Sequence, residues 1–152
     1  MPWALAPALS VFAVLSGVLA VVDARTRRLP DTIVLPGGAA VVLLLGAAAL
    51  VVGEPARLAG VGAGAAGAFA ACLAVHLARP AAFGGGDVKL AALCGAVLGW
   101  GGLEAVASGI ALAFLAGGVA GIGVVLGGAR RTSFPFGPFL LFGTWWRVIA
   151  GL

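Results

Sequence analysis

Apolar runs of about 20 residues, separated by short charged turns, most limit what this chain can fold into. Of its 152 residues, 62% are hydrophobic and only 9% are charged, and the mean hydropathy is +1.20. A helix of about 20 apolar residues crosses a hydrocarbon core of about 30 Å and pairs its own backbone groups. The runs lack the polar and apolar alternation of a membrane β-barrel. The sequence therefore predicts an all-α, polytopic membrane protein.

About six transmembrane helices are expected, all in a single membrane-embedded domain that covers residues 1–152. The runs are Trp3–Val22, Thr32–Val52, Leu58–Leu77, Val88–Trp100, Ala105–Gly128 and Phe134–Leu152. The first run follows no basic segment and is longer than the apolar part of a signal peptide, so we expect a spanning helix. The fourth run is short, so either its start lies within protein or it continues through Gly101-Gly102-Leu103.

Two glycine pairs suggest where helices approach closely. Gly60 and Gly64 in the third run, and Gly117 and Gly121 in the fifth, are each four residues apart. Small residues at this spacing share one helix face and favour close helix packing in membranes.

Basic residues are divided unequally between the two sides of the predicted bundle. Those on the first side are Arg25, Arg27, Arg28, Arg79, Lys89, Arg130 and Arg131, against Arg57 and Arg147 on the other. Because cytoplasmic loops are enriched in Lys and Arg, we expect the first side to face the cytoplasm and both termini to lie outside. The net charge of +4 thus reflects topology, and with no block of five like charges, no nucleic-acid partner is predicted. Trp145 and Trp146 are expected to be interfacial anchors of the last run.

Three of the five acidic residues, Asp23, Asp31 and Asp87, share the expected cytoplasmic side. Ionisable residues at a membrane boundary are costly and are therefore candidates for function. Asp87 and Asp31 could instead be N-caps of the helices that follow them. Asp23 ends a helix, where the macrodipole disfavours an anion, although the arginines that follow could offset this in a surface salt bridge.

Paired carboxylates at a water-accessible cleft can hydrolyse a peptide bond. One ionised acid deprotonates water while its protonated partner donates a hydrogen bond to the scissile carbonyl, and like charges close together favour sharing one proton. Asp23 and Asp87 are the natural pair. Lys89 either acts on Asp87 or a substrate carbonyl, or is a topogenic charge. The glycines before Asp87 permit positive φ and close approach of a substrate backbone, or form a plain flexible turn.

Few residues support other chemistries. Cys72 and Cys94 lie in apolar runs without CxxC spacing, so neither a zinc site nor a disulfide is expected. His76, the single histidine, is expected to pack or to reach the interface rather than to bind metal. The glycines lack a GxxxxGK[ST] pattern, and the serines lack a nucleophile-elbow context. No metal and no organic cofactor are predicted.

Three motifs, in order along the chain, resemble a known family. Gly84-Gly85-Gly86-Asp87-Val88-Lys89-Leu90 resembles the GxGD signature of the type IV prepilin peptidases, aspartic membrane proteases that include archaeal preflagellin peptidases. Asp23 with Leu29-Pro30-Asp31 resembles the first acidic motif of that family, at a suitable distance from Asp87. Pro135-Phe136-Gly137-Pro138 resembles a third family element. The motifs extend over essentially the whole chain, so the resemblance is specific.

The resemblance implies an endopeptidase in a bacterial or archaeal cytoplasmic membrane, with Asp23 and Asp87 as its catalytic pair. Motif support or substrate positioning is expected from Gly84, Gly86, Lys89, Asp31, Pro135, Gly137 and Pro138. The expected partners are the lipid bilayer and a prepilin-like substrate, a pilin or pseudopilin whose short basic leader is cut at the cytoplasmic face, typically after glycine. The chain begins with its first span and has no CxxC region, so the resemblance predicts no methyltransferase activity. It is similar to the short form found with Flp or tight-adherence pili.

Two further functions remain open from the residues alone. A small proton-coupled carrier would relay protons through buried carboxylates, but it is expected to place an acid near the bilayer centre, and no run has one. A non-catalytic assembly protein would tolerate neutralisation of both aspartates. The pathway, the substrate and the oligomeric state are not predicted.

Overall fold

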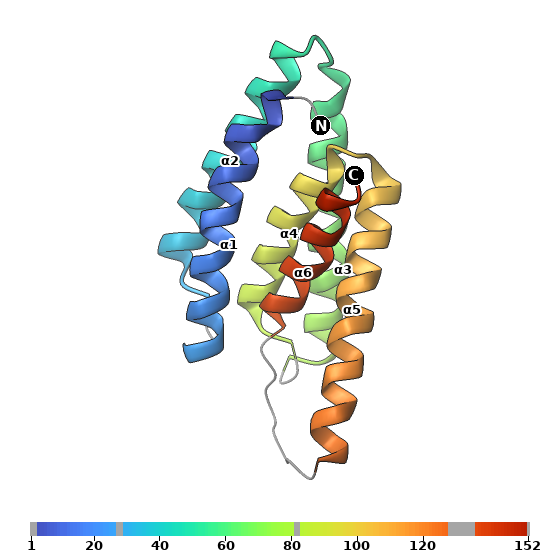
Figure 1. Ribbon diagram of the computed structural model, residues 1–152. Helices are drawn as coiled ribbons and strands as arrows, with labels where there is room; N and C mark the ends of the chain where they lie inside the picture. The colour runs from blue at the N-terminus through green and yellow to red at the C-terminus, as the bar shows by residue number, and fades with distance from the viewer. Residues whose placement is uncertain (1–2, 27–28, 81–82, 128–135, 152) are drawn as a thin grey trace.

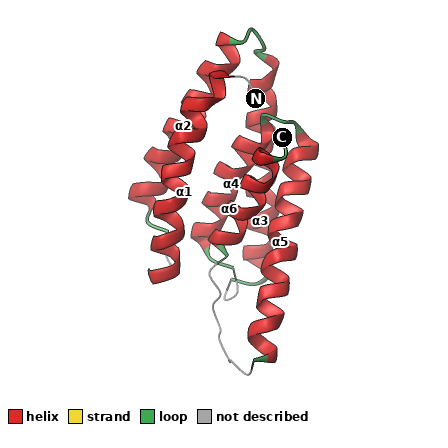
Figure 2. Cartoon of the chain, in the orientation of Figure 1, coloured by secondary structure: helices red, strands yellow, loops and turns green. Residues whose placement is uncertain are grey.

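The described part of the chain is helical throughout. The computed structural model describes residues 3–26, 29–80, 83–127 and 136–151. Within these residues there is no strand (Figures 1 and 2). The elements are η1 (Trp3–Leu5), α1 (Ala6–Thr26), α2 (Asp31–Val51), α3 (Ala56–Ala78), α4 (Gly85–Gly99), α5 (Leu103–Leu126) and α6 (Gly137–Ile149). The predicted all-α fold is confirmed, with one helix for each predicted run.

Four stretches are long and apolar enough to cross a membrane. They are Trp3–Thr26, Asp31–Val51, Ala56–Ala78 and Leu103–Val124. This confirms a multi-pass membrane protein. The other two helices, α4 with 15 residues and α6 with 13, are shorter than the about 20 residues that a span requires.

Helix α4 lies inside the protein rather than against lipid. It packs against α2, α3, α5 and α6, and most of its residues are buried, including Asp87 and Val88 at its start. It ends at Gly99, and α5 begins at Leu103 after a turn in which Gly102 has φ of +93°, a conformation that suits glycine. Of the two explanations for the short fourth run, a start within protein is therefore correct.

The helices form two regions, which Figure 1 shows side by side. The first, here called the hairpin, comprises η1, α1 and α2. The second, here called the block, comprises α3, α4, α5 and α6. Helices α1 and α2 pack along each other, and they meet the block where α1 contacts α6 and where α2 contacts α3 and α4.

Within the block, helices cross backbone to backbone at glycines. A Cβ on Gly60 or Gly99 would overlap the carbonyl oxygen of the other, and the same holds for Gly64 and Gly95. The predicted close packing at Gly60 and Gly64 is therefore confirmed, and α4 is its partner. Gly143 of α6 meets the Gly109 carbonyl of α5 in the same way.

The second predicted glycine pair behaves differently at its two positions. A Cβ on Gly117 would lie 2.6 Å from the Phe136 ring, so this glycine is closely packed, against a side chain. A Cβ on Gly121 would have no neighbour within 4 Å among the described residues, so close packing at Gly121 is not observed there. Gly121 lies on the same face of α5 as Gly117, as its spacing predicts. The contact of α5 with the described residues of α6 ends near Gly117, so Gly121 has no partner among them.

The hairpin meets the block through side chains. The indole N–H of Trp145 in α6 donates a hydrogen bond of 3.2 Å to the Ser16 hydroxyl of α1. The Trp145 ring also stacks on Phe12, with ring centroids 5.4 Å apart. Trp145 thus joins two helices, whereas Trp146 is 59% exposed. Their role as interfacial anchors stays a prediction.

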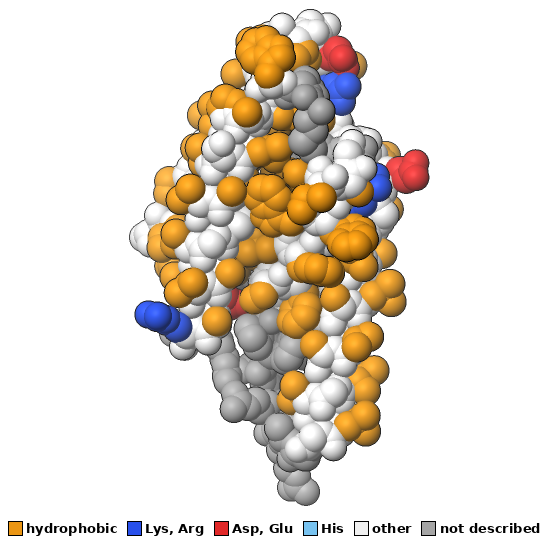
Figure 3. Space-filling model, viewed as in Figure 1, with side chains coloured by type: hydrophobic (Ala, Val, Ile, Leu, Met, Phe, Trp, Pro, Cys, Tyr) orange, Lys and Arg blue, Asp and Glu red, His pale blue; other side chains and the backbone are white. Residues whose placement is uncertain are grey.

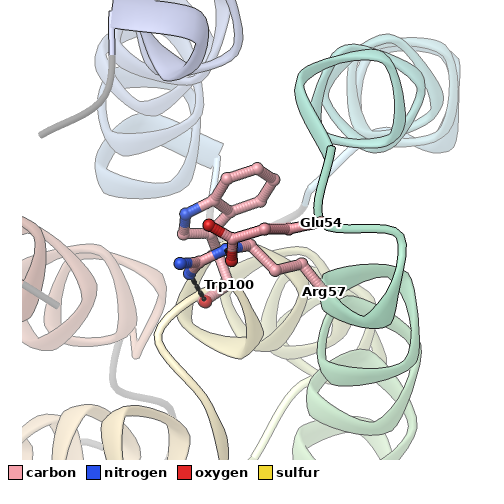
Figure 4. Close-up of polar contacts among 3 residues, drawn as sticks. All are labelled: Glu54, Arg57 and Trp100. Atoms are coloured by element: carbon pink, nitrogen blue, oxygen red, sulfur yellow. Dashed lines mark hydrogen bonds and ion pairs between the residues drawn. The ribbon is translucent and has the colours of Figure 1, made fainter. Parts of the chain in front are cut away.

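A polar cluster closes one end of the block (Figure 4). Arg57, near the start of α3, donates a hydrogen bond of 2.9 Å from Nη1 to the carbonyl oxygen of Trp100, just after α4. It also pairs with Glu54 at 2.6 Å and lies 5.0 Å from the centre of the Trp100 ring. This cluster joins the end of α4 to the start of α3.

The surface of the bundle is largely apolar between its ends. Figure 3 shows hydrophobic side chains over most of the visible face, with the charged side chains on that face lying mainly toward the helix ends. Side chains such as Leu43, Leu115 and Leu126 are highly exposed. A surface of this kind suits contact with lipid.

Candidate active site

The structure brings Asp23 and Asp87 together at one end of the bundle, here called the site end. Asp23 lies in the last turn of α1, in the hairpin, and Asp87 lies in the first turn of α4, in the block. Both are buried, with exposed fractions of 4% and 7%. They are close enough for the charge of Asp23 to act on Asp87. The site therefore spans the boundary between the two regions.

Gly137, from the third motif, lies directly against the two carboxyl groups. A Cβ at this position would be 2.8 Å from Oδ2 of Asp23 and 3.4 Å from the Leu90 side chain, so a larger residue would displace the carboxylate. The backbone N–H of Gly137 is also near enough to Asp87 to favour the ionised form of that carboxyl group. Gly137 is the first residue of α6, where N–H groups lack helical partners and favour a negative charge. Phe136-Gly137 thus supplies the third side of the site.

Only one oxygen of Asp87 is used in helix capping. The N-cap of α4 is Gly84, and its N–H donates a hydrogen bond of 3.3 Å to Oδ2 of Asp87. The predicted N-cap at Asp87 is therefore displaced by three residues, with the carboxylate reaching back to the cap. The buried atoms Oδ1 of Asp87 and Oδ2 of Asp23 have no hydrogen-bond partner among the described residues. A shared proton, a water or a substrate atom would satisfy them.

The environment of Asp87 favours its protonated form. Asp87 lies just before the predicted run Val88–Trp100 and outside the four candidate membrane spans. Burial, followed by the negative charge of Asp23, raises the pKa of Asp87 to about 7, although backbone hydrogen bonds from Gly84 and Gly137 oppose this. Asp87 therefore exchanges its proton near neutral pH, as a general acid or base requires.

Asp31 and Lys89 form an ion pair with each other. Lys89 Nζ lies 2.6 Å from Oδ1 of Asp31, and the two side chains are 41% and 55% exposed. The N-cap of α2 is Pro30, with no side-chain cap hydrogen bond, and Asp31 is the first residue of the helix. Asp31 is therefore not the predicted N-cap, because its carboxylate pairs with a cation on another helix. The pair links the hairpin to the block outside the buried site.

The glycines before Asp87 allow close packing rather than positive φ. Gly84 has φ of −72°, and the described glycines with positive φ are Gly53, Gly102 and Gly151. A Cβ on Gly86 would lie 2.9 Å from the Leu29 side chain, and one on Gly84 would lie 3.3 Å from Oδ2 of Asp87. The described glycines of this turn do not use the positive φ that glycine permits, and they accommodate neighbouring atoms of the chain itself.

Aromatic contacts join the turn before Asp87 to the segment before Gly137. The Phe136 ring centroid lies 5.0 Å from that of Phe83 and 4.9 Å from that of Phe114. These contacts hold the two glycine segments against each other.

His76 also supports this turn. Its ring Nδ1 lies 2.6 Å from the carbonyl oxygen of Phe83, so Nδ1–H is the donor. From the sequence, His76 was expected to pack or to reach the interface, and neither Phe83 nor Phe136 had a predicted role. The available signal was the position of both phenylalanines directly before a glycine of a motif.

The remaining predicted site residues are less central. Pro138 is the second residue of α6, where a missing N–H costs nothing. Pro135, like Arg27, Arg28, Arg130 and Arg131, lies outside the described residues. Cys72 and Cys94 are buried free thiols. Among the described residues, no group of three or more His, Cys, Asp or Glu side chains is arranged to hold a metal ion.

Fold and site define a class of protein: a multi-pass helical membrane protein with two buried, interacting carboxyl groups from different helices. The sequence model of the type IV leader peptidase family matches residues 10–126, well over half of the chain. The chain belongs to this family, which implies a peptidase that acts on protein substrates. The matched residues include Asp23, Asp31, Asp87 and Lys89, whereas the third motif follows them. No curated protein and no solved structure matches the chain.

Proposed function

We propose that this protein is an aspartic endopeptidase that removes the leader peptide of prepilin-like proteins, including those of Flp or tight-adherence pili. The observation that carries this proposal is the pairing of buried Asp23 and Asp87 against the N-terminus of α6. Membership of the type IV leader peptidase family supports the reaction class. The substrate class comes from the resemblance of the three motifs to prepilin peptidases.

In this mechanism the two aspartates share one proton, which we place on Asp87. The ionised partner accepts a proton from water as the water oxygen attacks the scissile carbonyl carbon, while Asp87 donates to the carbonyl oxygen. Collapse of the tetrahedral intermediate breaks the C–N bond, and the pair supplies the proton that the leaving amine needs. The unpartnered oxygens Oδ2 of Asp23 and Oδ1 of Asp87 are suited to hold this water and proton.

We also propose that the site end faces the cytoplasm of a bacterial or archaeal cell, with the chain forming a single membrane domain. Arg25 and Lys89 lie on helices near the site end, and Arg79 directly follows α3 there. Arg57 and Arg147 lie toward the other end. A cytoplasmic excess of Lys and Arg is the usual pattern in membrane proteins. A basic leader would then meet the site before it could cross the membrane.

The proton-carrier alternative receives no comparable support. Asp23, Asp31, Asp87 and Glu104 lie in first or last helical turns, and Glu54 lies in a turn between helices. A proton relay across the membrane requires ionisable groups within the bilayer core. The acids of this chain instead suit chemistry at a membrane boundary.

Co-expression with candidate prepilins from the same genome tests the proposal. We expect wild type to shorten one of them on a gel, and Asp23→Asn or Asp87→Asn to abolish the shift. Glu104→Gln is the matched control, because Glu104 is exposed at the other end of the bundle. Cleavage by either aspartate variant, confirmed by sequencing the new N-terminus, would refute the mechanism.

A further inference from the structure

An apolar groove lies on the boundary between the hairpin and the block. It has a volume of about 290 Å³ and is lined by residues of α2, α3 and α4. Val34 and Val42 of α2 form one wall, Phe69 lies on the α3 side, and Ala92 and Ala96 belong to α4. From Val34 to Val42 a helix advances about 12 Å, so the groove follows the helices for about two turns.

One end of this groove is charged. Lys89 lines it and pairs with Asp31, the first residue of α2. The charged end is therefore the site end of the bundle, because Asp87 precedes Lys89 by two residues on the same helix. The groove thus leads from an apolar region to an ion pair beside the site.

A second apolar groove on the bundle serves as a comparison for the first. It has a volume of about 400 Å³ and is lined by residues of α1 and α2 alone, including Val14 and Val18. Among the residues that the structure describes, no charged side chain lines it, and none of its lining residues belongs to the helix that carries Asp87. Lipid chains suit either groove, but only the first combines an apolar trough with charges beside the site.

The walls of the first groove suit a helix. Gly38 and Ala39 of α2, Ala65 of α3 and Ala92 and Ala96 of α4 are small residues. Membrane helices pack closely where small residues let their backbones approach. A stretched chain that leaves such a helix at the site end next meets the exposed glycines Gly84 and Gly85, which offer no side chain to block it.

We propose that this groove receives the membrane-spanning helix of the substrate, and that Asp31 at its charged end meets the basic leader. This inference rests on the proposed function, because it takes the substrate to be a protein anchored in the membrane beside its cleavage point. The side chain of Asp31 is 55% exposed, so a Lys or Arg of the leader can reach its carboxylate and compete there with Lys89. The leader then passes the glycine turn to reach Asp23 and Asp87.

Site-specific photo-cross-linking tests the groove directly. The probe is a co-expressed single-span reporter with a short Lys- and Arg-rich leader that ends in glycine, followed by an apolar helix of about 20 residues. A photoreactive residue replaces Val42 in the first groove or Val18 in the second, and both valines are 42% exposed. We expect at least about tenfold more reporter cross-linked from position 42. Equal cross-linking from both positions, or cross-linking to lipid alone, would overturn the proposal.

Filling the groove gives a second readout. Val42→Trp is expected to raise KM for the spanning reporter at least about tenfold, and to leave unchanged the cleavage of a soluble peptide that holds the leader without the apolar helix. Val18→Trp is the control and should change neither the KM for the spanning reporter nor the cleavage of the soluble peptide. A Val42→Trp variant that cleaves both substrates like wild type would contradict the proposal. If Val42→Trp does not fold, the comparison of cross-linking from positions 42 and 18 still tests whether the substrate helix occupies the first groove.

The two experiments separate this inference from the proposed function. Cleavage of the reporter without cross-linking from position 42 would refute the groove and leave the peptidase proposal intact. Cross-linking without cleavage by folded wild-type protein would support the groove and count against the proposed substrate class. If the reporter is neither cleaved nor cross-linked from position 42, both proposals fail.

Discussion

The block and the hairpin differ in how their helices are held. In the block, α3 crosses α4, and α5 crosses α6, at glycines where backbone meets backbone. The hairpin instead reaches the block through side chains, such as Ser16 with Trp145 and Asp31 with Lys89. A backbone crossing fixes two helices within a narrow range, whereas a side-chain contact can adjust by changing rotamer.

This difference matters because the candidate site takes one aspartate from each region. Asp87 belongs to the rigidly packed block, together with Gly137, and Asp23 belongs to the hairpin. The distance between the two carboxyl groups therefore depends on the contacts that join the regions. The proposed substrate groove follows the same boundary, so occupation of the groove and geometry of the site are connected.

The largest effect is expected from breaking a backbone crossing in the block. In Gly95→Ala the new Cβ overlaps the Gly64 carbonyl, and overpacking of this kind costs about 1–3 kcal/mol or more. We expect a loss of unfolding free energy of that size, measured by denaturation in mixed micelles, together with loss of cleavage. Gly62→Ala is the matched control, because a Cβ there has no neighbour within 4 Å. Equal stability of the two variants would show that the crossing is not rigid.

A smaller and more local effect is expected at the junction of the two regions. In Gly137→Ala the Cβ would lie 2.8 Å from Oδ2 of Asp23 and push that carboxylate away. A displacement of about 1 Å at a reacting group can cost about 10²-fold in rate, so we expect a loss of cleavage of that order. The unfolding free energy should fall less than in Gly95→Ala. Gly118→Ala, in open surroundings on α5, should leave both quantities close to wild type.

The coupling between the regions can be measured through the proton on Asp87. Its pKa is raised from 3.8 to about 7, so the proton is present below about pH 7 and lost above it. Cleavage that needs one shared proton should therefore decline as the pH rises through about 7. By linkage, the unfolded chain releases this proton near pH 4, so folding stability falls as the pH rises from about 4 to about 7.

Asp23→Asn separates the two causes of this shift. Removing the negative charge leaves burial, the largest cause, opposed by the backbone groups of Gly84 and Gly137. The pKa of Asp87 should therefore fall below its wild-type value while staying above 3.8. The infrared C=O band of the protonated carboxyl group, followed against pH with Asp87→Asn as the blank, measures this. An unchanged pKa in Asp23→Asn would mean that the carboxyl groups are too far apart to act as a pair.

The smallest effect is expected from one side-chain contact between the regions. Ser16→Ala removes the acceptor of the Trp145 hydrogen bond but leaves the stacking of Trp145 on Phe12, so about 1 kcal/mol of stability should be lost. Ser108→Ala is the control, since Ser108 also bonds a carbonyl four residues earlier in its helix, as Ser16 does. A greater loss in Ser108→Ala would show that the contact with α6 is unimportant.

Local patterns were enough to predict the helices but not their partners. The apolar runs predicted each helix within a few residues, because hydropathy determines which segments enter a membrane. The motifs indicated Asp23 and Asp87 as a pair through a family resemblance, and the geometry now places them together. Their roles in catalysis stay predictions. Crossing partners such as Gly95 for Gly64 depend on which helices become neighbours, and local periodicity does not contain this information.

The errors at polar residues have a similar cause. An N-cap was one of two roles left open for Asp31, but Asp31 pairs with Lys89, 58 positions later in the chain. His76 and Phe83 support the turn before Asp87 through one hydrogen bond and a ring contact that depend on the folded path of the loop. Side chains with several possible partners are assigned only when the tertiary neighbours are known.

The cluster at the far end of α4 has a consequence for motion along the helix axis. Arg57 holds the Trp100 carbonyl by a hydrogen bond and lies over the Trp100 ring, about 20 Å along the helix from Asp87. A slide of α4 by one turn, about 5.4 Å, would break both contacts. Piston-like displacement of α4 is therefore opposed, and the position of Asp87 along the helix axis is set by an arginine at the other end of the helix.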